Sequence, residues 1–504
     1  MGVVPVRDKS YRVHNINRFT GGMTFTQQGD DESEKFENFE MLRDGYLTSR
    51  LGCYKANSNS IGSAAIVGIG KVTAGGNTFT FAAKTGTTWY YSTSNSWPVA
   101  FSSITVPESP LTDAVRMESV LDSSNASYAV FTNVNFTRLI SWDGGAASAS
   151  QIAGSPANMT FVRHFDGRLY AANKAQTIYF SDKSNPFSWP TANVFYVSSV
   201  YGGIRGLERY PGMLLILMER AILGLRGDPA TGFNVTVLHD RIGCDTEASV
   251  STSGSATAFR FERETYLFNG NVTSLTANLT GLQIADAGAS SANSWGVLTP
   301  YHYVMRRSRG TGAVATEAYV LNRQLGNLWG LWNYPTATLL GASSPLQAIV
   351  AAPNLTDGFL MNGGDGSLYF QPIRQAGDFN YTNSIVAFTE DDTTRPVLSL
   401  WRSKKFYLGS STLVKQWRRV LVGGSGTAVS LTARYRNPAG TLVTEVLKSS
   451  ATVPFNVDTP TIDGVTGQSL FSSLQIELSG NSLQIPDVQV HWRPVRFSAG
   501  GDLS

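Results

Sequence analysis

Two neighbouring stretches, FVRHFDGRLYAAN at Phe161–Asn173 and YFSDKSNPFSWP at Tyr179–Pro190, decide the fold of this chain. In the first, two strand-like segments flank an Asp-Gly pair, which favours the tight turn of a β-hairpin. The second begins as a third strand and ends in a polar turn closed by a tryptophan and a proline. Together they predict an antiparallel sheet of the kind from which β-propellers are built.

The same strand-turn-strand pattern recurs through most of the chain, at irregular intervals that average about 46 residues. Six further stretches carry it: Thr78–Ser92, Tyr128–Trp142, Leu214–Gly227, Phe259–Leu275, Glu317–Trp332 and Gly358–Phe370. In one of them the run LLILM at Leu214–Met218 is continuously apolar, as expected for a strand buried on both faces. Because a propeller blade takes roughly 40–50 residues, the spacing predicts an all-β fold with an irregular β-propeller of six to eight blades, seven being favoured.

The repeat ends near Asp378, where the composition changes. A charged linker at Thr389–Pro396 leads into alternating strands that predict a separate β-sandwich-like module. We therefore expect an N-terminal arm or platform segment at 1–55, a β-propeller at 56–385 and a C-terminal β platform module at 386–504. The N-terminal segment lies outside the repeat and is expected to pair with the C-terminal module.

Two local patterns add detail outside the repeat. In the C-terminal module, ARYRNPAGTLV predicts a hairpin whose turn is Asn437–Gly440. In the N-terminal segment, Asp31–Leu42 has acidic residues early and apolar residues at helical spacing. It fits either a short helix or an extended arm.

The chain is weakly charged for its length. Charged residues make up 15% of its 504 residues, and the formal net charge is +3. A soluble domain ordinarily has about 25% charged residues. With so small a net charge, no basic tail or patch indicates nucleic-acid binding. The composition fits a β protein that buries much of its exterior in an assembly, and it fits a β-rich monomer equally well.

Cysteine content and apolar runs indicate the compartment. With only Cys53 and Cys244, a disulfide framework is excluded and free thiols are expected. The first residues have no apolar core, so no signal peptide is predicted. The longest apolar run, Met213–Met218, is too short to span a bilayer. We expect a protein synthesised in a cytoplasm, with no membrane-spanning segment.

No motif predicts catalysis, a cofactor or a metal. The histidines are dispersed without metal-ligand spacing: His14, His164, His239, His302 and His491. The turn SWDGG at Ser141–Gly145 begins like the repeated turn of sialidase propellers, but Ala147 and Ser148 break the match. We predict no catalytic, cofactor-binding or metal-binding residues.

Several residues that could suggest a site have simpler interpretations. The acidic groups Asp30–Glu32 and Asp391–Asp392 lie in polar connecting segments, whereas glycoside hydrolysis needs two carboxylates at one site. Asn269-Gly270 and Asp365-Gly366 read as hairpin turns. Trp329 and Trp332 are assigned to the core, and Asp182 and Trp189 are assigned to turn and packing roles. The clustered arginines are assigned to solvated faces or subunit contacts: Arg306, Arg307, Arg309, Arg418 and Arg419.

Four segments are informative in their order along the chain: Tyr179–Pro190, Asp240–Val250 (DRIGCDTEASV), Glu264–Ala277 (ETYLFNGNVTSLTA) and Leu400–Val422 (LWRSKKFYLGSSTLVKQWRRVLV). Taken together, they resemble the tail nozzle (tail stabilisation) proteins of short-tailed bacteriophages. The chain departs from the family pattern in a compressed spacing before the third hairpin and in extra arginines at His302–Gly310.

The resemblance implies a structural virion protein of the phage tail rather than an enzyme. It implies a homohexamer that docks on the head-tail adaptor ring and extends the DNA-exit channel. Tail fibres, and a needle or plug, would be further partners, and double-stranded DNA would pass without specific binding. Synthesis would take place in the bacterial host cytoplasm. The alternative function is a carbohydrate-binding or glycan-degrading tail propeller.

Overall fold

Antiparallel strands form nearly all the regular structure of the chain in the computed structural model. It describes residues 5–7, 12–16, 33–37, 39–41, 47–49, 54–93, 98–111, 113–262, 264–276, 295–300, 302–306, 317–323, 328–333, 348–349, 357–362, 366–373, 398–403, 415–436, 442–458, 470–471, 474–485 and 487–497. Within these residues the only helical elements are two short 3-10 turns, η1 (Ser199–Tyr201) and η2 (Glu247–Ser249). The predicted all-β class is confirmed.

Contacts divide the chain into two compact units. Unit 1 comprises Met1–Gly52, Val320–Asn333 and Arg374–Ser504, and unit 2 comprises Cys53–Tyr319 and Tyr334–Ile373. The sequence-based division placed the boundaries at 55/56 and 385/386 and kept 320–333 in the propeller.

Unit 2 contains six separate four-stranded sheets among the described residues. The first consists of β7 (Ile66–Ala74), β8 (Asn77–Lys84), β9 (Thr88–Ser92) and β10 (Ser102–Thr105). The second consists of β11 (Arg116–Leu121), β12 (Ser127–Thr132), β13 (Ile140–Trp142) and β14 (Ser150–Gln151). The third consists of β15 (Phe161–Phe165), β16 (Arg168–Ala172), β17 (Thr177–Phe180) and β18 (Val194–Tyr196).

The other three sheets follow in chain order. The fourth consists of β19 (Ile204–Tyr210), β20 (Met213–Met218), β21 (Ile222–Asp228) and β22 (Gly232–His239). The fifth consists of β23 (Ser251–Ser253), β24 (Ala256–Phe261), β25 (Glu264–Phe268) and β26 (Val272–Ser274). The last consists of β31 (Ala348–Ile349), β32 (Asp357–Asn362), β33 (Leu368–Ile373) and β6 (Tyr54–Lys55).

Four more strands lie between the fifth and the last sheet in the sequence: β27 (Trp295–Leu298), β28 (His302–Arg306), β29 (Glu317–Asn322) and β30 (Leu328–Asn333). They are neighbours in consecutive order within a 15-stranded sheet. All seven predicted hairpins are confirmed, because each predicted stretch contains two successive strands that are neighbours in a sheet. The number of blades stays a prediction.

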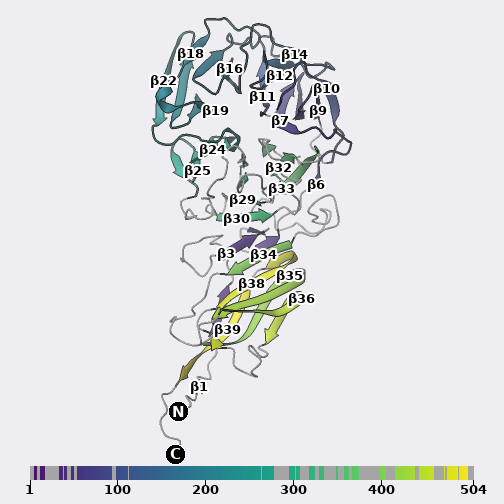
Figure 1. The fold of residues 1–504 in the computed structure, drawn as a ribbon, viewed down its shortest axis with the longest axis vertical. Coiled ribbons are helices and arrows are strands. Elements are labelled where there is room, and N and C mark those ends of the chain that lie inside the picture. Colours follow the sequence, from purple (N-terminus) through teal and green to yellow (C-terminus); the bar gives the residue numbers. More distant parts are fainter. Residues whose placement is uncertain are drawn as a thin grey trace, which may run out of the picture. The chain divides into compact units, whose positions relative to one another are not determined.

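The sheets of unit 2 pack face to face around a common centre, as in a β-propeller. Successive first strands, β7, β11, β15 and β19, contact one another. Hydrophobic clusters of buried side chains fill the spaces between the first and second, second and third, third and fourth, and fourth and fifth sheets. Figure 1 shows β7, β11 and β19 on the inner side of this arrangement and β10, β14 and β22 on the outer side. The predicted propeller fold is confirmed.

Aromatic rings dominate the cluster between the first two sheets. The Phe79 ring lies 4.7 Å from the Trp142 ring, and the Trp89 ring lies 5.2 Å from the Phe131 ring, both edge to face. Burying a side chain such as phenylalanine contributes about 1.5–3 kcal/mol. The strand β20 is buried at every position, as its continuous apolar run predicted.

A strand from before the first sheet completes the last one. Pairing of β6 with β33 places Tyr54 opposite Phe370 and Lys55 opposite Tyr369. The Ala56 amide donates to the Leu368 carbonyl at 2.7 Å. The fourth strand of the last sheet therefore comes from the beginning of unit 2, and this pairing closes the propeller.

Lys84, at the end of β8, reinforces this closure. Its buried Nζ donates to the carbonyls of Ile61 (2.8 Å), Gly62 (2.5 Å) and Gly366 (2.9 Å). Two of these carbonyls follow β6 in the chain, and the third precedes β33. One ammonium group thus joins the first sheet to both parts of the last sheet.

In unit 1, strands from the two ends of the chain pair with each other. β1 (Pro5–Arg7) and β2 (Arg12–Ile16) pair with β39 (Val488–Phe497). β3 (Ser33–Glu37) pairs with β34 (Leu398–Ser403), and β5 (Leu47–Ser49) pairs with β4 (Phe39–Met41) and β38 (Leu474–Ile485). The long strands β35 (Lys415–Arg436) and β36 (Leu442–Asp458) pair along their length, and β37 (Leu470–Phe471) also pairs with β35.

β35 changes partners midway. Its first half pairs with β39 and its second half pairs with β38. Gly424 (φ 109°) lies between the two halves and Gly426 (φ 155°) follows the first residue that pairs with β38, both in a backbone region that favours glycine. Bends of this kind let a strand pass from one sheet of a sandwich to the other.

Two local predictions of the sequence are resolved in unit 1. The segment Asp31–Leu42 contains strands β3 and β4, so the extended alternative is confirmed and the helix is wrong. The hydrogen bonds between β3 and β34 satisfy the backbone groups of this segment, and they outweigh its short helical pattern. The hairpin at ARYRNPAGTLV is confirmed by the pairing of Arg436 with Leu442, and its turn residues 437–440 lie outside the described residues.

Candidate functional site

The first strands of four successive sheets carry charged residues of alternating sign. These are Lys71 on β7, Glu118 on β11, Arg163 on β15 and Glu208 on β19. The last three follow one another at intervals of 45 positions. Because the first strands contact one another near the propeller axis, these side chains come together there.

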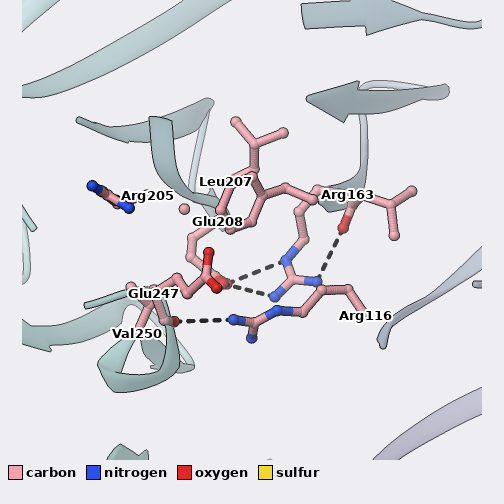
Figure 2. A pocket seen from close by; sticks show the side chains of 10 residues that line it. Arg116, Arg163, Arg205, Leu207, Glu208, Glu247 and Val250 are labelled. Carbon is pink, nitrogen blue, oxygen red and sulfur yellow. Dashed lines mark hydrogen bonds and ion pairs between the residues drawn. The ribbon is translucent and has the colours of Figure 1, made fainter. Parts of the chain in front are cut away.

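Arg163 is the centre of this group. Its Nη2 donates to Glu208 Oε1 at 2.7 Å and its Nε donates to Glu208 Oε2 at 3.3 Å. Its Nη1 lies 3.6 Å from Glu118 Oε2 and donates to the Val162 carbonyl. Figure 2 shows the guanidinium turned toward Glu208, with Arg116 beside it. Such a two-pronged pairing is a strong form of ion pair.

Burial and charge act in opposite directions on these groups. Burial disfavours the charge on Arg163, but Glu208 and Glu118 outweigh it and raise its pKa. Burial raises the pKa of Glu118, which Arg163 and Arg209 oppose. Two glutamates thus share one arginine in a largely desolvated place.

Arg116, at the start of β11, is differently placed. Its side chain is only 6% exposed, and its Nη2 donates to the backbone carbonyl of Glu247 at 3.1 Å (Figure 2). Its buried Nε has no hydrogen-bond partner among the described residues. Burial lowers its pKa, and Glu247 opposes that shift.

A small void lies next to Arg116. Its volume is about 10 Å³, enough for one water molecule. Arg205 Nε and Glu247 Oε2, which are also buried and without a hydrogen-bond partner among the described residues, belong to residues that line it. Glu247 Oε1 accepts from Lys174 Nζ at 2.9 Å.

A larger cavity, called the axial cavity below, shares Arg116, Arg163, Glu208 and Val250 with the small void. Its volume is about 330 Å³. It is lined by Lys71, Arg116, Met117, Glu118, Ser119, Arg163, Glu208, Arg209, Val250, Ser251, Thr252 and Gly254. Four cations and two carboxylates among these residues leave a net charge of about +2. A second hollow of about 420 Å³, lined in part by His164 and Tyr210, shares Arg209 and Gly254 with it.

The histidines do not gather at this site. His164 lines the second hollow, and burial, then Arg209, lowers its pKa. His302 is buried on β28, which lowers its pKa to about 3. His239 Nδ1 accepts from the Arg241 and Ile242 amides, and His14 and His491 lie on the paired strands β2 and β39. Over the part of the chain that the structure describes, no three metal-ligating side chains cluster.

Turn and packing roles predicted for several residues are confirmed. Asp182 accepts from Ser188 Oγ (2.6 Å) and Asn193 Nδ2 (3.2 Å), and Trp189 Nε1 donates to the Pro186 carbonyl. Trp329 and Trp332 are buried. Hydrogen bonds from the Ala146 and Gly145 amides hold the Asp143 pKa low, as in a structural turn.

The other predicted positions divide between described and undescribed residues. Gly270 (φ 104°) and Gly366 (φ 77°) have the backbone of tight turns. Cys244 is a free, buried thiol, and burial raises its pKa to about 12. Arg306 lies on β28, and Arg418 and Arg419 lie on β35. The following lie outside the described residues: Asp30–Glu32, Cys53, Arg307, Arg309, Asp365 and Asp391–Asp392.

Sequence reasoning missed the charged residues of the axial cavity. They come from four different blades, so no local motif contains the whole set. The available signal was the interval of 45 positions that joins Glu118, Arg163 and Glu208, close to the hairpin spacing itself. No helix of the described residues is long and apolar enough to cross a membrane.

Comparison with protein-family models finds no match, and comparison with curated proteins also finds none. Among solved structures, the chain is similar to the computationally designed Ika8 protein, with 12% identity and a TM-score of 0.38 over 63% of this chain and 99% of that one. It is also similar to the WD40 β-propeller domain of Doa1, with 8% identity and a TM-score of 0.41 over 64% of this chain and 96% of that one.

Proposed function

We propose that this chain is a structural protein of a short bacteriophage tail, the subunit of a nozzle below the head-tail adaptor ring. The supporting observation is the course of the chain. Strands from both ends pair in unit 1, and most of the sequence between them forms the propeller. The four segments that resemble tail nozzle proteins, with Tyr179–Pro190 and Asp240–Val250 among them, support the same proposal.

The proposed assembly is a homohexameric ring that continues the DNA-exit channel. In a closed ring, each subunit presents two different complementary surfaces to its neighbours. The adaptor ring, tail fibres, and a needle or plug are the proposed partners, and DNA passes through without specific binding. The proposed location is the virion tail, after synthesis in the bacterial host cytoplasm.

A structural role without catalysis agrees with the chemistry of the axial carboxylates. Glu118 and Glu208, which line one cavity, are both held by Arg163. Glycoside hydrolysis needs one carboxyl group to donate a proton and another to act as base or nucleophile. The Arg163 guanidinium bridges these two carboxylates, so it occupies the place between them that a glycosidic bond would need.

Quantitative mass spectrometry of particles from the encoding phage tests the structural role. The expected result is six copies of this chain per particle, with a six-fold ring at the tail in electron cryomicroscopy. Absence of the chain from purified particles would contradict the proposal.

A polysaccharide cleavage assay tests the absence of catalysis. The purified full-length chain is incubated with acidic and neutral polysaccharides, and released reducing ends are measured. No release above the buffer control is expected. Release that disappears in Glu118→Gln would instead support the glycan-degrading alternative.

A further inference from the structure

We propose that the axial cavity binds a small organic anion that also carries hydroxyl groups, the chemical class of the sugar acids. This inference goes beyond the proposed tail function. It is carried by the charge balance of the cavity, by a buried arginine in its wall and by the polar groups that share that wall.

The charge balance favours an anionic ligand. Arg163 is already paired with both glutamates of the cavity. Arg209 lies 3.9 Å from Glu118 Oε1 and is 58% exposed, so its pairing is weak. Lys71 is exposed on β7. The net positive charge therefore resides mainly on Arg116, Arg209 and Lys71.

Arg116 adds a buried cation to the wall of the axial cavity. A buried guanidinium ordinarily uses its donors on acceptors, since a buried donor without a partner is unfavourable. The Arg116 Nε is such a donor, and Arg116 lines the axial cavity. Because this Nε is enclosed by protein, an oxyanion in the axial cavity would offset the buried charge of Arg116 rather than accept from this donor. The carboxylate of Glu247, which lines the small void, offsets part of the Arg116 charge, and an anion in the axial cavity would add to that effect.

The remaining lining groups suit the hydroxyls of such a ligand. Ser119, Ser251 and Thr252 contribute hydroxyl groups. The carboxylates of Glu118 and Glu208 have oxygens that can accept from ligand hydroxyls in addition to Arg163. The volume of about 330 Å³ falls at the lower end of the range of small-molecule sites. A single acidic sugar unit is therefore a better match than a longer chain.

Ligand-observed NMR on the purified full-length protein tests the proposal. The probes are glucuronate, galacturonate and N-acetylneuraminate, with glucose as the neutral analogue and inorganic phosphate as an anion without carbon-bound hydroxyls. We expect saturable binding of at least one sugar acid, weakened by added salt. Glucose and phosphate are expected to bind at least tenfold more weakly.

Substitutions locate the binding. Arg116→Gln is expected to weaken sugar-acid binding at least tenfold, and Arg209→Gln severalfold. Arg241→Gln removes an exposed arginine outside the cavity and is expected to leave binding unchanged. If circular dichroism shows that Arg116→Gln does not fold, the double variant Arg209→Gln/Lys71→Gln, which removes two exposed cations, is expected to weaken sugar-acid binding instead.

Three outcomes would overturn the proposal. Saturable binding of no sugar acid in the panel removes it entirely. Glucose binding as tightly as the acids removes the charge argument, and phosphate binding as tightly removes the role of the hydroxyl groups. None of these outcomes bears on particle composition, so the proposed tail function is tested separately.

Discussion

Arg163 shows how a single residue can connect three blades of the propeller. It lies on β15 and pairs with Glu118 on β11 and Glu208 on β19. All three side chains are at most 16% exposed. In such a place the pairing energy mainly offsets the desolvation of the charges, but removal of one partner leaves the others uncompensated.

Replacing Arg163 with methionine is therefore expected to destabilise unit 2 by about 3–5 kcal/mol. The measurement is the unfolding midpoint in urea, with intrinsic fluorescence as the signal. Lys183→Met serves as control, since Lys183 and Asp166 form a pair whose side chains are about half exposed. That substitution should cost at most about 1 kcal/mol. Equal losses of stability in the two variants would show that the axial ion pairs contribute no more than an exposed ion pair.

His302 predicts a dependence of stability on pH. Its pKa in the folded protein is about 3, lowered by burial, against 6.5 for an unperturbed histidine. The unfolded chain therefore binds a proton below pH 6.5 that the folded chain does not. This contribution to stability is complete above pH 6.5 and is lost as the pH falls toward 3, by about 1.4 kcal/mol per pH unit.

The check is the unfolding free energy of wild type and His302→Gln at pH 7.5, 6, 5 and 4. The values at pH 7.5 give the baseline, because the imidazole is neutral in both states there. We expect the difference between the two proteins to shift in favour of His302→Gln as the pH falls. Parallel pH profiles would mean that the pKa of His302 does not differ between the folded and the unfolded state.

Among the structural elements, hairpins follow most directly from the sequence. The β15–β16 hairpin turns at Asp166 (φ 46°) and Gly167 (φ 74°). Two central residues with positive φ define the turn type that matches the twist of the flanking strands, and Asp-Gly favours it. The alternation of apolar and polar residues then decides which face of each strand is buried, so the hairpins could be predicted without tertiary information.

Pairing between distant elements was harder to predict. The N-terminal segment was expected to join the C-terminal module, but the use of β6 to complete the last propeller sheet was not foreseen. A two-residue strand such as Tyr54–Lys55 has too little pattern to be recognised alone. At Asp31–Leu42 the sequence left a helix and an extended arm open, and ladder bonds to β34 decided for the extended conformation.

Lys84→Met tests the importance of the propeller closure. The substitution removes the donor to three backbone carbonyls, and we expect a loss of at least about 2 kcal/mol. Hydrogen exchange should accelerate at the Ala56 and Leu368 amides, which connect the β6 region to the last sheet, and remain slow at Leu215 in β20.

Lys71→Met is the matched control, because Lys71 is an exposed lysine on the neighbouring strand β7. It should leave the exchange rates at Ala56 and Leu368 unchanged. Unchanged rates in Lys84→Met as well would show that strand pairing alone maintains the closure.

At the scale of the whole molecule, the propeller is expected to have seven blades. Six four-stranded sheets are separate, and β27–β30 are consecutive neighbours that lie in sequence between the fifth and the last of them. Electron cryomicroscopy of the protein is expected to show β27–β30 as the remaining blade. Six or eight sheets around the axis would contradict this prediction.

The sequence by itself determined the strands, the hairpin turns and the propeller class. These depend on interactions between residues close in the chain, namely turn sterics and the alternation of buried and exposed side chains. Only the tertiary structure decided the closure through β6 and the gathering of Arg116, Glu118, Arg163 and Glu208 at the axis. Each of those depends on which strands meet after folding, because no short segment contains more than one blade's contribution.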